Sequence, residues 1–352
     1  MTRHTLATLV AAGLVLVLGI TVAAVSVPYV RESPGPTVDV LGTREGEPVV
    51  EVEGRRTFPT DGSLRLTTVL VTQPERAFNL LGALGGWFAR DTAVLPYEAV
   101  YPDDTTAEDE QAESAAQMVN SQDTAVAAAL AELGFDLPRF AEVSGITPDG
   151  PSDGELEPRD RIVSLEGDPV TDVRQVFRTV GRAEPGDTVT GEVRRGGRTR
   201  SFEVTTVAAP DDPDRAMLGI LVGTGYDFPF DVRIGISDSI GGPSAGLIFS
   251  LAVYDTLTKG SLTGGADVAG TGTIAADGSV GPIGGIQQKI SGAEATGAEL
   301  FLVPPDNCGE ALEADVDDSE IRLVRADTMS SAVKALETYR DDPDAELPRC
   351  TA

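Results

Sequence analysis

Two side chains, Ser244 and Lys289, have types and surroundings that could form a nucleophile without histidine. Ser244 lies within residues 241–246 (GGPSAG), and Lys289 ends the stretch 281–289 (GPIGGIQQK). The only histidine is His4, at the extreme N-terminus, so composition excludes a Ser-His-Asp triad. A serine activated by a desolvated lysine amine remains open, because that variant occurs on unrelated folds.

The chain offers few alternatives for the base, because only three of its 27 basic residues are lysines. A lysine with its ordinary pKa of about 10.4 is a poor base at neutral pH, so it must be buried among apolar groups to be neutral. Lys289 lies between Ile286 and Ile290, which is consistent with such burial. Lys259 is better explained as a charge at a helix C-terminus, and Lys334 as a surface residue of a terminal helix.

The elements around Ser244 are predicted from glycine positions and apolar runs. Residues 217–236 indicate two strands separated at 223–225 (GTG), and an apolar helix follows from about residue 244 to residue 257. Ser244 is thus expected in the first turn of that helix, with Gly242 and Pro243 lining the site. Unpaired N–H groups and the positive end of the macrodipole lie there and could stabilise an oxyanion.

Lys289 is predicted near the start of a second helix. Residues 264–280 indicate strand, turn and strand around Asp277–Gly278, and Gly284–Gly285 then open the helix. Further upstream, residues 49–53 and 64–71 have strand-like runs with a turn at 59–62, which together suggest a hairpin.

The N-terminal run from Thr5 to Val30 carries no charged side chain and exceeds the roughly 20 residues that cross a bilayer as a helix. It predicts a membrane anchor, with Arg3 placing the N-terminus in the cytoplasm and the body outside. The alternative is a cleaved signal peptide, because residues 24–26 (AVS) provide small residues at a suitable spacing. Both interpretations export the rest of the chain.

Composition limits the partners. The 352 residues carry a formal net charge of −29, which would repel nucleic acid, so we expect no nucleic-acid partner.

Cys308 and Cys350 would be free to pair as a disulfide in an oxidising compartment, and the alternative is that both remain unpaired thiols. Neither cysteine has a histidine partner nearby, so a mixed Cys/His zinc site is disfavoured and no metal or cofactor is expected.

The middle of the chain, residues 128–208, resembles a PDZ domain. The resemblance rests on a turn at 150–156 (GPSDGEL), the strand at 159–167 (RDRIVSLEG), a helix at 172–180, and a hairpin with 195–198 (RGGR) as its turn. A PDZ groove binds an extended peptide as an added strand and holds the peptide carboxylate with loop N–H groups. Residues 133–135 (LGF) are the nearest match to that loop.

The last third resembles the proteolytic domain of Lon proteases over roughly 120 residues, through residues 242–246 (GPSAG), 271–273 (TGT), 282–285 (PIGG) and Lys289, in the family's order. The resemblance implies that Ser244 is the nucleophile, that Lys289 is the general base, and that Thr271 orients the lysine. Gly241 stands where cytosolic Lon proteases usually have an acid, and Thr273 replaces a glutamate.

Together these features resemble the membrane-anchored, ATP-independent Lon-like peptidases of bacteria. The sequence has no Gly-x-x-x-x-Gly-Lys-Ser/Thr phosphate loop, so no ATP is expected. The predicted fold is a multidomain α+β chain: a cytoplasmic stub and transmembrane anchor (1–32), a strand and helix segment that packs with the protease core (33–127), the PDZ domain (128–208), the Lon-type α/β domain (215–340) and an acidic tail (341–352).

The resemblance implies a single-pass membrane protein whose extracytoplasmic body cleaves unfolded or flexible protein substrates, with the PDZ domain selecting or regulating, and a hexameric ring. The alternative is a PDZ-based binding or chaperone scaffold whose protease domain is inactive or tightly gated.

Overall fold

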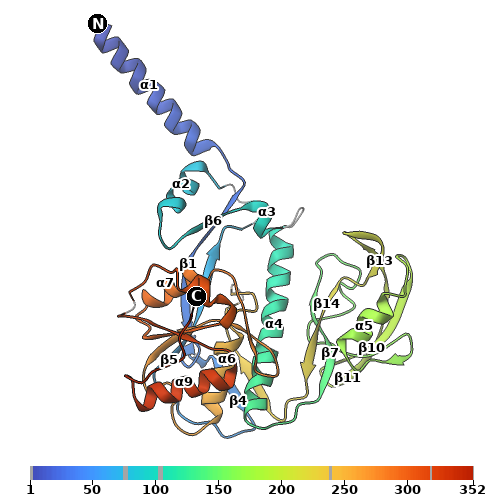
Figure 1. Cartoon of the computed structure of the whole chain (residues 1–352). Coiled ribbons are helices and arrows are strands. Elements are labelled where there is room, and N and C mark those ends of the chain that lie inside the picture. Colours follow the sequence, from blue (N-terminus) through green and yellow to red (C-terminus); the bar gives the residue numbers. More distant parts are fainter. Residues whose placement is uncertain (1–2, 74–77, 102–105, 238–239, 318, 352) are drawn as a thin grey trace.

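The computed structural model describes residues 3–73, 78–101, 106–237, 240–317 and 319–351. Helix α1 (Arg3–Ala24) projects from one end of a body built on a mixed sheet, and a second, smaller sheet lies beside the long helix α4 (Ala107–Glu132) (Figure 1). Within these residues, no helix combines the length and apolar character needed to cross a membrane, in contrast to the transmembrane helix expected from the sequence.

The main sheet has six strands in the order β20-β19-β16-β5-β1-β6. The four strands β5, β16, β19 and β20 run parallel, whereas β1 is antiparallel to both β5 and β6. Their bounds are β1 Tyr29–Asp39, β5 Ser63–Val71, β6 Ala93–Pro96, β16 Asp267–Gly270, β19 Leu300–Val303 and β20 Arg322–Arg325. Strands from the first hundred residues and from the last hundred therefore share one sheet.

The hairpin suggested for residues 49–53 and 64–71 is wrong. Strand β4 (Val50–Glu53) pairs with β15 (Asp231–Ile234), while β5 lies between β1 and β16. Arg65 and Leu66 of β5 pair with both β1 and β16, so this part of β5 has no edge left for β4.

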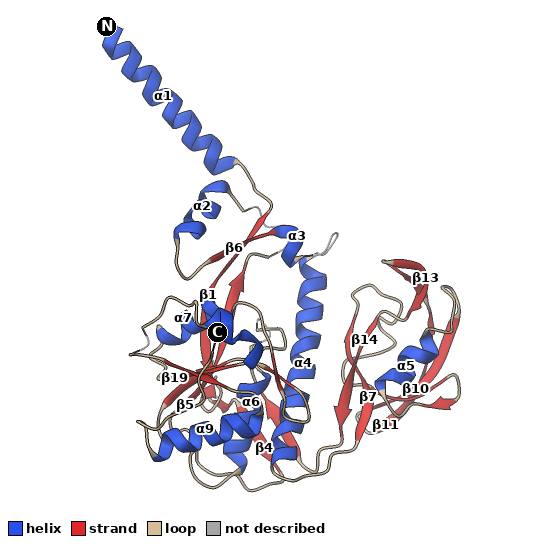
Figure 2. Cartoon of the chain, in the orientation of Figure 1, coloured by secondary structure: helices blue, strands red, loops and turns tan. Residues whose placement is uncertain are grey.

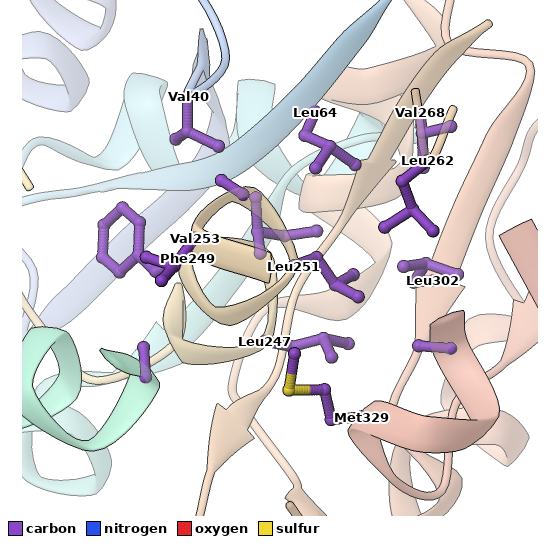
Figure 3. Close-up of a cluster of buried hydrophobic side chains, with 14 of the residues drawn as sticks. Val40, Leu64, Leu247, Phe249, Leu251, Val253, Leu262, Val268, Leu302 and Met329 are labelled. Carbon is purple, nitrogen blue, oxygen red and sulfur yellow. The ribbon is translucent and has the colours of Figure 1, made fainter. Parts of the chain in front are cut away.

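The two faces of the main sheet bury separate apolar clusters, because neighbouring strand residues point to opposite sides. In β19, Leu300 and Leu302 belong to the larger cluster, whereas Phe301 and Val303 belong to the smaller one. The larger cluster contains α6 (Gly246–Leu257), α9 (Met329–Asp341) and part of α4 (Figure 3). The smaller contains α7 (Ile286–Glu294). Helix α6 is apolar nearly all round, as expected for a helix buried on all sides.

The second sheet also has six strands and is called the smaller sheet because its buried core is smaller. Its strand order is β11-β10-β8-β7-β14, with the short β9 paired to β8, and α5 (Val173–Val180) packs on it. Its strands are β7 Arg139–Ile146, β8 Arg161–Leu165, β10 Thr188–Arg195, β11 Arg198–Thr205 and β14 Ile220–Tyr226 (Figure 2). It has its own buried core. The predicted helix at 172–180 and the hairpin around 195–198 match α5, β10 and β11.

Strand β14 corrects the prediction that residues 223–225 separate two strands. The strand runs through Gly223 and Gly225 and pairs with β7 along its whole length. A Cβ at Gly223 would overlap the Asn120 side chain, and one at Gly225 would overlap the Phe140 ring. These glycines therefore permit close packing, and the smaller sheet extends to residue 226.

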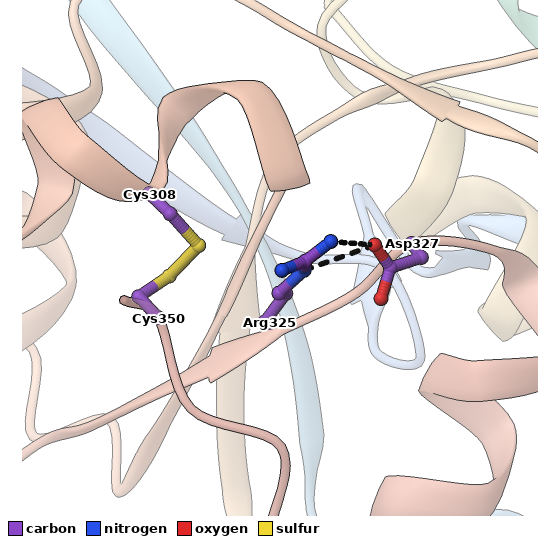
Figure 4. Close-up of a disulfide and its surroundings, with 4 residues drawn as sticks. All are labelled: Cys308, Arg325, Asp327 and Cys350. Atoms are coloured by element: carbon purple, nitrogen blue, oxygen red, sulfur yellow. Dashed lines mark hydrogen bonds and ion pairs between the residues drawn. A yellow bond between two sulfur atoms is a disulfide. The ribbon is translucent and has the colours of Figure 1, made fainter. Parts of the chain in front are cut away.

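The C-terminal segment is held against the body. Cys308 and Cys350 form a disulfide across 42 residues of sequence (Figure 4), Leu347 is buried, and Arg349 forms a bridge with Val324 of β20. Residues 347–350, within the predicted acidic tail, therefore pack against the body.

The remaining elements are short. They are α2 Leu80–Phe88, α3 Tyr97–Val100, α8 Cys308–Ala311, the 3-10 helix Pro305–Asn307, β2 Thr43–Arg44, β3 Glu47–Pro48, β9 Asp168–Pro169, β12 Val207–Ala209, β13 Asp212–Met217, β17 Thr273–Ile274 and β18 Val280–Gly281. The turn predicted at Asp277–Gly278 joins β17 to β18, and the Asp277 carboxylate accepts hydrogen bonds from Ser279.

Candidate active site

Ser244 lies in the turn directly before α6, not in the first turn of that helix. The helix begins at Gly246, and Ala245 is its N-cap. Gly242 has φ of +84°, a left-handed conformation that favours glycine, and it turns the chain into Pro243 and Ser244. The N–H of Leu247 donates to the carbonyl of Gly272, so one early donor of α6 is already occupied.

Lys289 lies one turn into α7, at a position that the fold buries. Gly285 is the N-cap in the left-handed conformation, with φ of 67°, and its carbonyl accepts from the N–H of Lys289. The Lys289 side chain is only 4% exposed, and Ile286 and Ile290 beside it are fully buried. This burial lowers the pKa of Lys289 from 10.5 to about 8, and the charge of Glu32 opposes the shift.

Thr271 joins the lysine to the turn that carries Ser244. The Nζ atom of Lys289 donates to Oγ1 of Thr271 over 3.3 Å, and that hydroxyl donates to the carbonyl of Ser244 over 3.0 Å. The N–H of Gly272 donates to the same carbonyl over 2.8 Å. Three residues predicted for the site, Ser244, Lys289 and Thr271, are thus connected by hydrogen bonds.

A cleft of about 580 Å³ contains both Ser244 and Lys289. Its volume is that of an ordinary ligand pocket. Gly241 and Pro243 also line it, whereas Gly242 does not and instead shapes the turn. On the opposite side the cleft is lined by residues 66–71 of β5.

Strand β5 presents an open edge along this cleft. Its pairing with β16 ends where Leu66 faces Gly270, and Thr67 to Val71 are paired only with β1. Unpaired N–H and C=O groups on a strand edge can add an extended peptide as another strand. The cleft therefore offers backbone hydrogen bonds next to Ser244 that do not depend on the peptide's side chains.

Glu32 is a residue of the cleft that the sequence did not reveal. It lies on β1 opposite Val71, and its carboxylate makes no hydrogen bond or ion pair with any other residue that the structure describes. Burial raises the pKa of Glu32, the charge of Glu310 raises it further, and Lys289 lowers it. The sequence contains no motif that points to Glu32, because this residue is distant in sequence from both Ser244 and Lys289. Only the pairing of β1 with β5 places it in the cleft.

Residues 133–135 do not form the peptide loop of the smaller sheet. They follow α4, and Leu133 and Phe135 pack against the core cluster of the main body. The edge strands of the smaller sheet are β11 and β14, and α5 packs near β14. A peptide added to this sheet as a strand beside α5 would therefore pair with β14.

Among the described residues, no group of three or more His, Cys, Asp and Glu side chains could hold a metal ion. The chemistry derived below therefore uses only the hydroxyl, amine and carboxylate groups of the cleft.

Comparison with known proteins finds family models that match part of each half of the body. A PDZ domain model matches residues 116–206, and a model of the Lon protease (S16) C-terminal proteolytic domain matches residues 237–336. Lon protease 1 of Sorangium cellulosum is 33% identical over 120 residues, covering 32% of this chain and 14% of the relative. Lon protease of Geobacter metallireducens is 32% identical over 129 residues, covering 35% of this chain and 15% of the relative.

The chain thus spans about one seventh of the length of these relatives. Among solved structures, the PDZ domain of an SdrC-like protein from Listeria monocytogenes is similar at 18% identity, covering 24% of this chain and 86% of that one with a TM-score of 0.22. A score this low supports no further argument. The two family matches and the Lon relatives thus identify a PDZ domain and a Lon-type proteolytic domain in this chain, a combination that fits a PDZ-containing, Lon-like peptidase.

Proposed function

We propose that this chain is an ATP-independent serine endopeptidase in which Ser244 is the nucleophile and Lys289 the general base. The observation that carries the proposal is that Ser244 and Lys289 line one cleft, while Thr271 joins the Lys289 amine to the backbone carbonyl of Ser244 by hydrogen bonds. A buried amine with a pKa of about 8 is neutral in a useful fraction of molecules near physiological pH, as a general base must be.

In the proposed reaction, neutral Lys289 takes the proton of the Ser244 hydroxyl while the serine oxygen attacks the peptide carbonyl carbon. The backbone N–H of Ser244, which makes no hydrogen bond with any other described residue, is available to the oxyanion. The resulting ammonium then protonates the leaving amine, which gives an acyl-enzyme. A water molecule, deprotonated by Lys289, hydrolyses the ester and restores the serine.

The proposed substrates are unfolded or flexible protein segments, because only an extended backbone can pair with Thr67 to Val71 of β5. The chain has no phosphate loop, so we propose that it does not use ATP to unfold its substrates. The PDZ domain would bind peptide ends at β14. A hexameric ring is proposed from the resemblance to Lon proteases, and sedimentation of the purified protein would test it.

The decisive experiment is cleavage of casein without ATP by the wild type and by Ser244→Ala, Lys289→Ala and Lys259→Ala. Lys259 is an exposed lysine outside the cleft, so its variant is the matched control. We expect cleavage and fluorophosphonate labelling to be lost in Ser244→Ala, cleavage to be lost in Lys289→Ala, and both to persist in Lys259→Ala. A folded wild type that neither cleaves nor reacts would instead favour the PDZ-based binding scaffold.

We also propose that the body lies outside the cytoplasm and is attached to a membrane through its N-terminal helix. The Cys308–Cys350 disulfide supports an oxidising compartment. Large apolar side chains of α1, such as Leu14 and Val15, are exposed and available to lipid. Trp87, the only tryptophan, is 53% exposed on α2 beside α1. Its fluorescence in the full chain should shift to shorter wavelength in vesicles, and unchanged emission would refute the attachment.

A further inference from the structure

Helix α4 lies between the two domains, where it contacts β7 and β14 of the smaller sheet and the helix α6 that packs on the main sheet (Figure 1). Its 26 residues begin with a capping box in which Thr106 and Asp109 satisfy each other's backbone N–H groups. One side of the helix packs along α6 of the proteolytic domain, and the other side packs on β7 and β14 of the PDZ domain. A helix in this position can transmit a constraint from one domain to the other.

The α6 side of α4 holds the loop that leads to Ser244. The carbonyl of Ser114 accepts from the N–H of Gly242 over 3.0 Å, and the hydroxyl of Ser121 donates to the carbonyl of Pro243 over 3.1 Å. The two serines are seven residues apart, which is about two helical turns, so they share one face. A Cβ at Gly241 would overlap the Ser114 side chain, and the glycine thus permits the close approach of the loop to α4.

The hydrogen bond from Ser121 to the carbonyl of Pro243 also sets the direction of the N–H group of Ser244. The peptide that joins Pro243 to Ser244 is planar and trans, so its C=O and N–H groups point in opposite directions. Holding the C=O toward α4 therefore turns the N–H of Ser244 away from α4. That N–H is the donor that the proposed mechanism uses for the oxyanion, whereas the N–H of Gly242 is already occupied by Ser114.

The opposite side of α4 is held by the PDZ domain. Arg159 donates to both carboxylate oxygens of Asp123, over 3.1 and 3.3 Å. Gly223 of β14 lies directly against the Asn120 side chain, and a Cβ there would overlap it. Asn120 and Asp123 flank Ser121 in the sequence, so the turn of α4 that reaches Pro243 is the turn that the PDZ domain fixes.

We propose that Ser121 is a positioning residue that orients the Ser244 peptide, and that the PDZ domain holds α4 so that Ser121 can do so. This inference rests on the proposed Ser244 chemistry. It assigns the PDZ domain a role in catalysis that needs no direct contact with substrate. Release of α4 from the PDZ sheet should lower the reactivity of Ser244 and leave peptide binding along β5 intact.

The test compares Ser121→Ala with Gln122→Ala in the full chain. Gln122 also donates a side-chain hydrogen bond from α4 to a backbone carbonyl, that of Ile234, but outside the nucleophile loop. Loss of one hydrogen bond in the site predicts a roughly three- to tenfold lower kcat for Ser121→Ala with little change in KM. Fluorophosphonate labelling should slow by a similar factor, and Ser121→Thr should restore part of the rate.

A second arm tests the PDZ contribution with Arg159→Gln, which removes the hydrogen bonds to Asp123. We expect a lower kcat at unchanged KM, and a much smaller effect of Arg159→Gln when Ser121 is already alanine. Three results would overturn the proposal while leaving the peptidase activity in place. They are equal kcat values for Ser121→Ala and Gln122→Ala, a change in KM alone, and additive effects of Ser121→Ala and Arg159→Gln. A wild type without cleavage or labelling would instead refute the proposed function itself.

Discussion

Proteolysis should depend on pH through the amine of Lys289. Burial brings the pKa of this amine from 10.5 to about 8. At pH 7.5, about a quarter of the molecules would carry the neutral amine, against about one in a thousand for an unshifted lysine. We therefore expect kcat/KM to rise with pH and to reach half of its maximum near pH 8, because only the neutral amine can take the serine proton.

Removing the charge of Glu32 tests the physical origin of the lowered pKa of Lys289. Glu32 is the charged group that raises the pKa of Lys289 against the effect of burial. Glu32→Gln should therefore lower the lysine pKa and move the half-maximal pH downward. Glu110→Gln is the matched control, since Glu110 also lines the cleft but does not perturb Lys289.

The assay is kcat/KM for a fluorogenic peptide from about pH 6 to about pH 10, with the free-enzyme pKa read from the rising limb. A flat profile over this range would refute the assignment of Lys289 as the base. An upward movement of the midpoint in Glu32→Gln, or an equal movement in Glu110→Gln, would refute the electrostatic reasoning.

Three further changes test a buried charge, a close contact and the disulfide. Burial raises the pKa of Glu142 from 4.5 to about 7. The stability contributed by this carboxyl is therefore fully present below about pH 4.5 and is lost as the pH rises through about 7. In Glu142→Gln, the free energy of unfolding measured with urea should change less with pH across this window. Gly241→Asp should slow labelling of the nucleophile, because the new side chain would overlap Ser114, and faster labelling would contradict the close packing. Cys308→Ser should lower the free energy of unfolding by about 4 kcal/mol, since it opens the loop of 42 residues closed by Cys350; an unchanged urea midpoint would contradict this.

Local sequence patterns predicted the parts of the site that depend on local backbone. Gly285 needs a left-handed conformation to start α7, and Lys289 follows within one turn, so both could be placed from the sequence. The sequence predicts that α6 begins at about Ser244, whereas the helix begins at Gly246, because the turn at Gly242 continues through Ser244. The pairing of Lys289 with Thr271 spans only 18 residues and matches the order of the Lon motifs.

Contacts between distant segments required the tertiary structure. Glu32 enters the cleft only because β1 pairs with β5. The predicted hairpin failed because β4 pairs with β15, while the first half of β5 lies between β1 and β16. Ser121 meets Pro243 across 122 residues of sequence.

The sequence by itself therefore indicated the types of domain and singled out Ser244 and Lys289 as the candidate pair, since glycine positions, apolar periodicity and motif order are properties of short segments. Only the tertiary structure decided which strand edge stays open along the cleft, which carboxylate lies near the lysine and which helix holds the loop before Ser244. These features depend on how separate segments satisfy their backbone hydrogen bonds and bury their apolar faces together, and no short stretch of sequence records that choice.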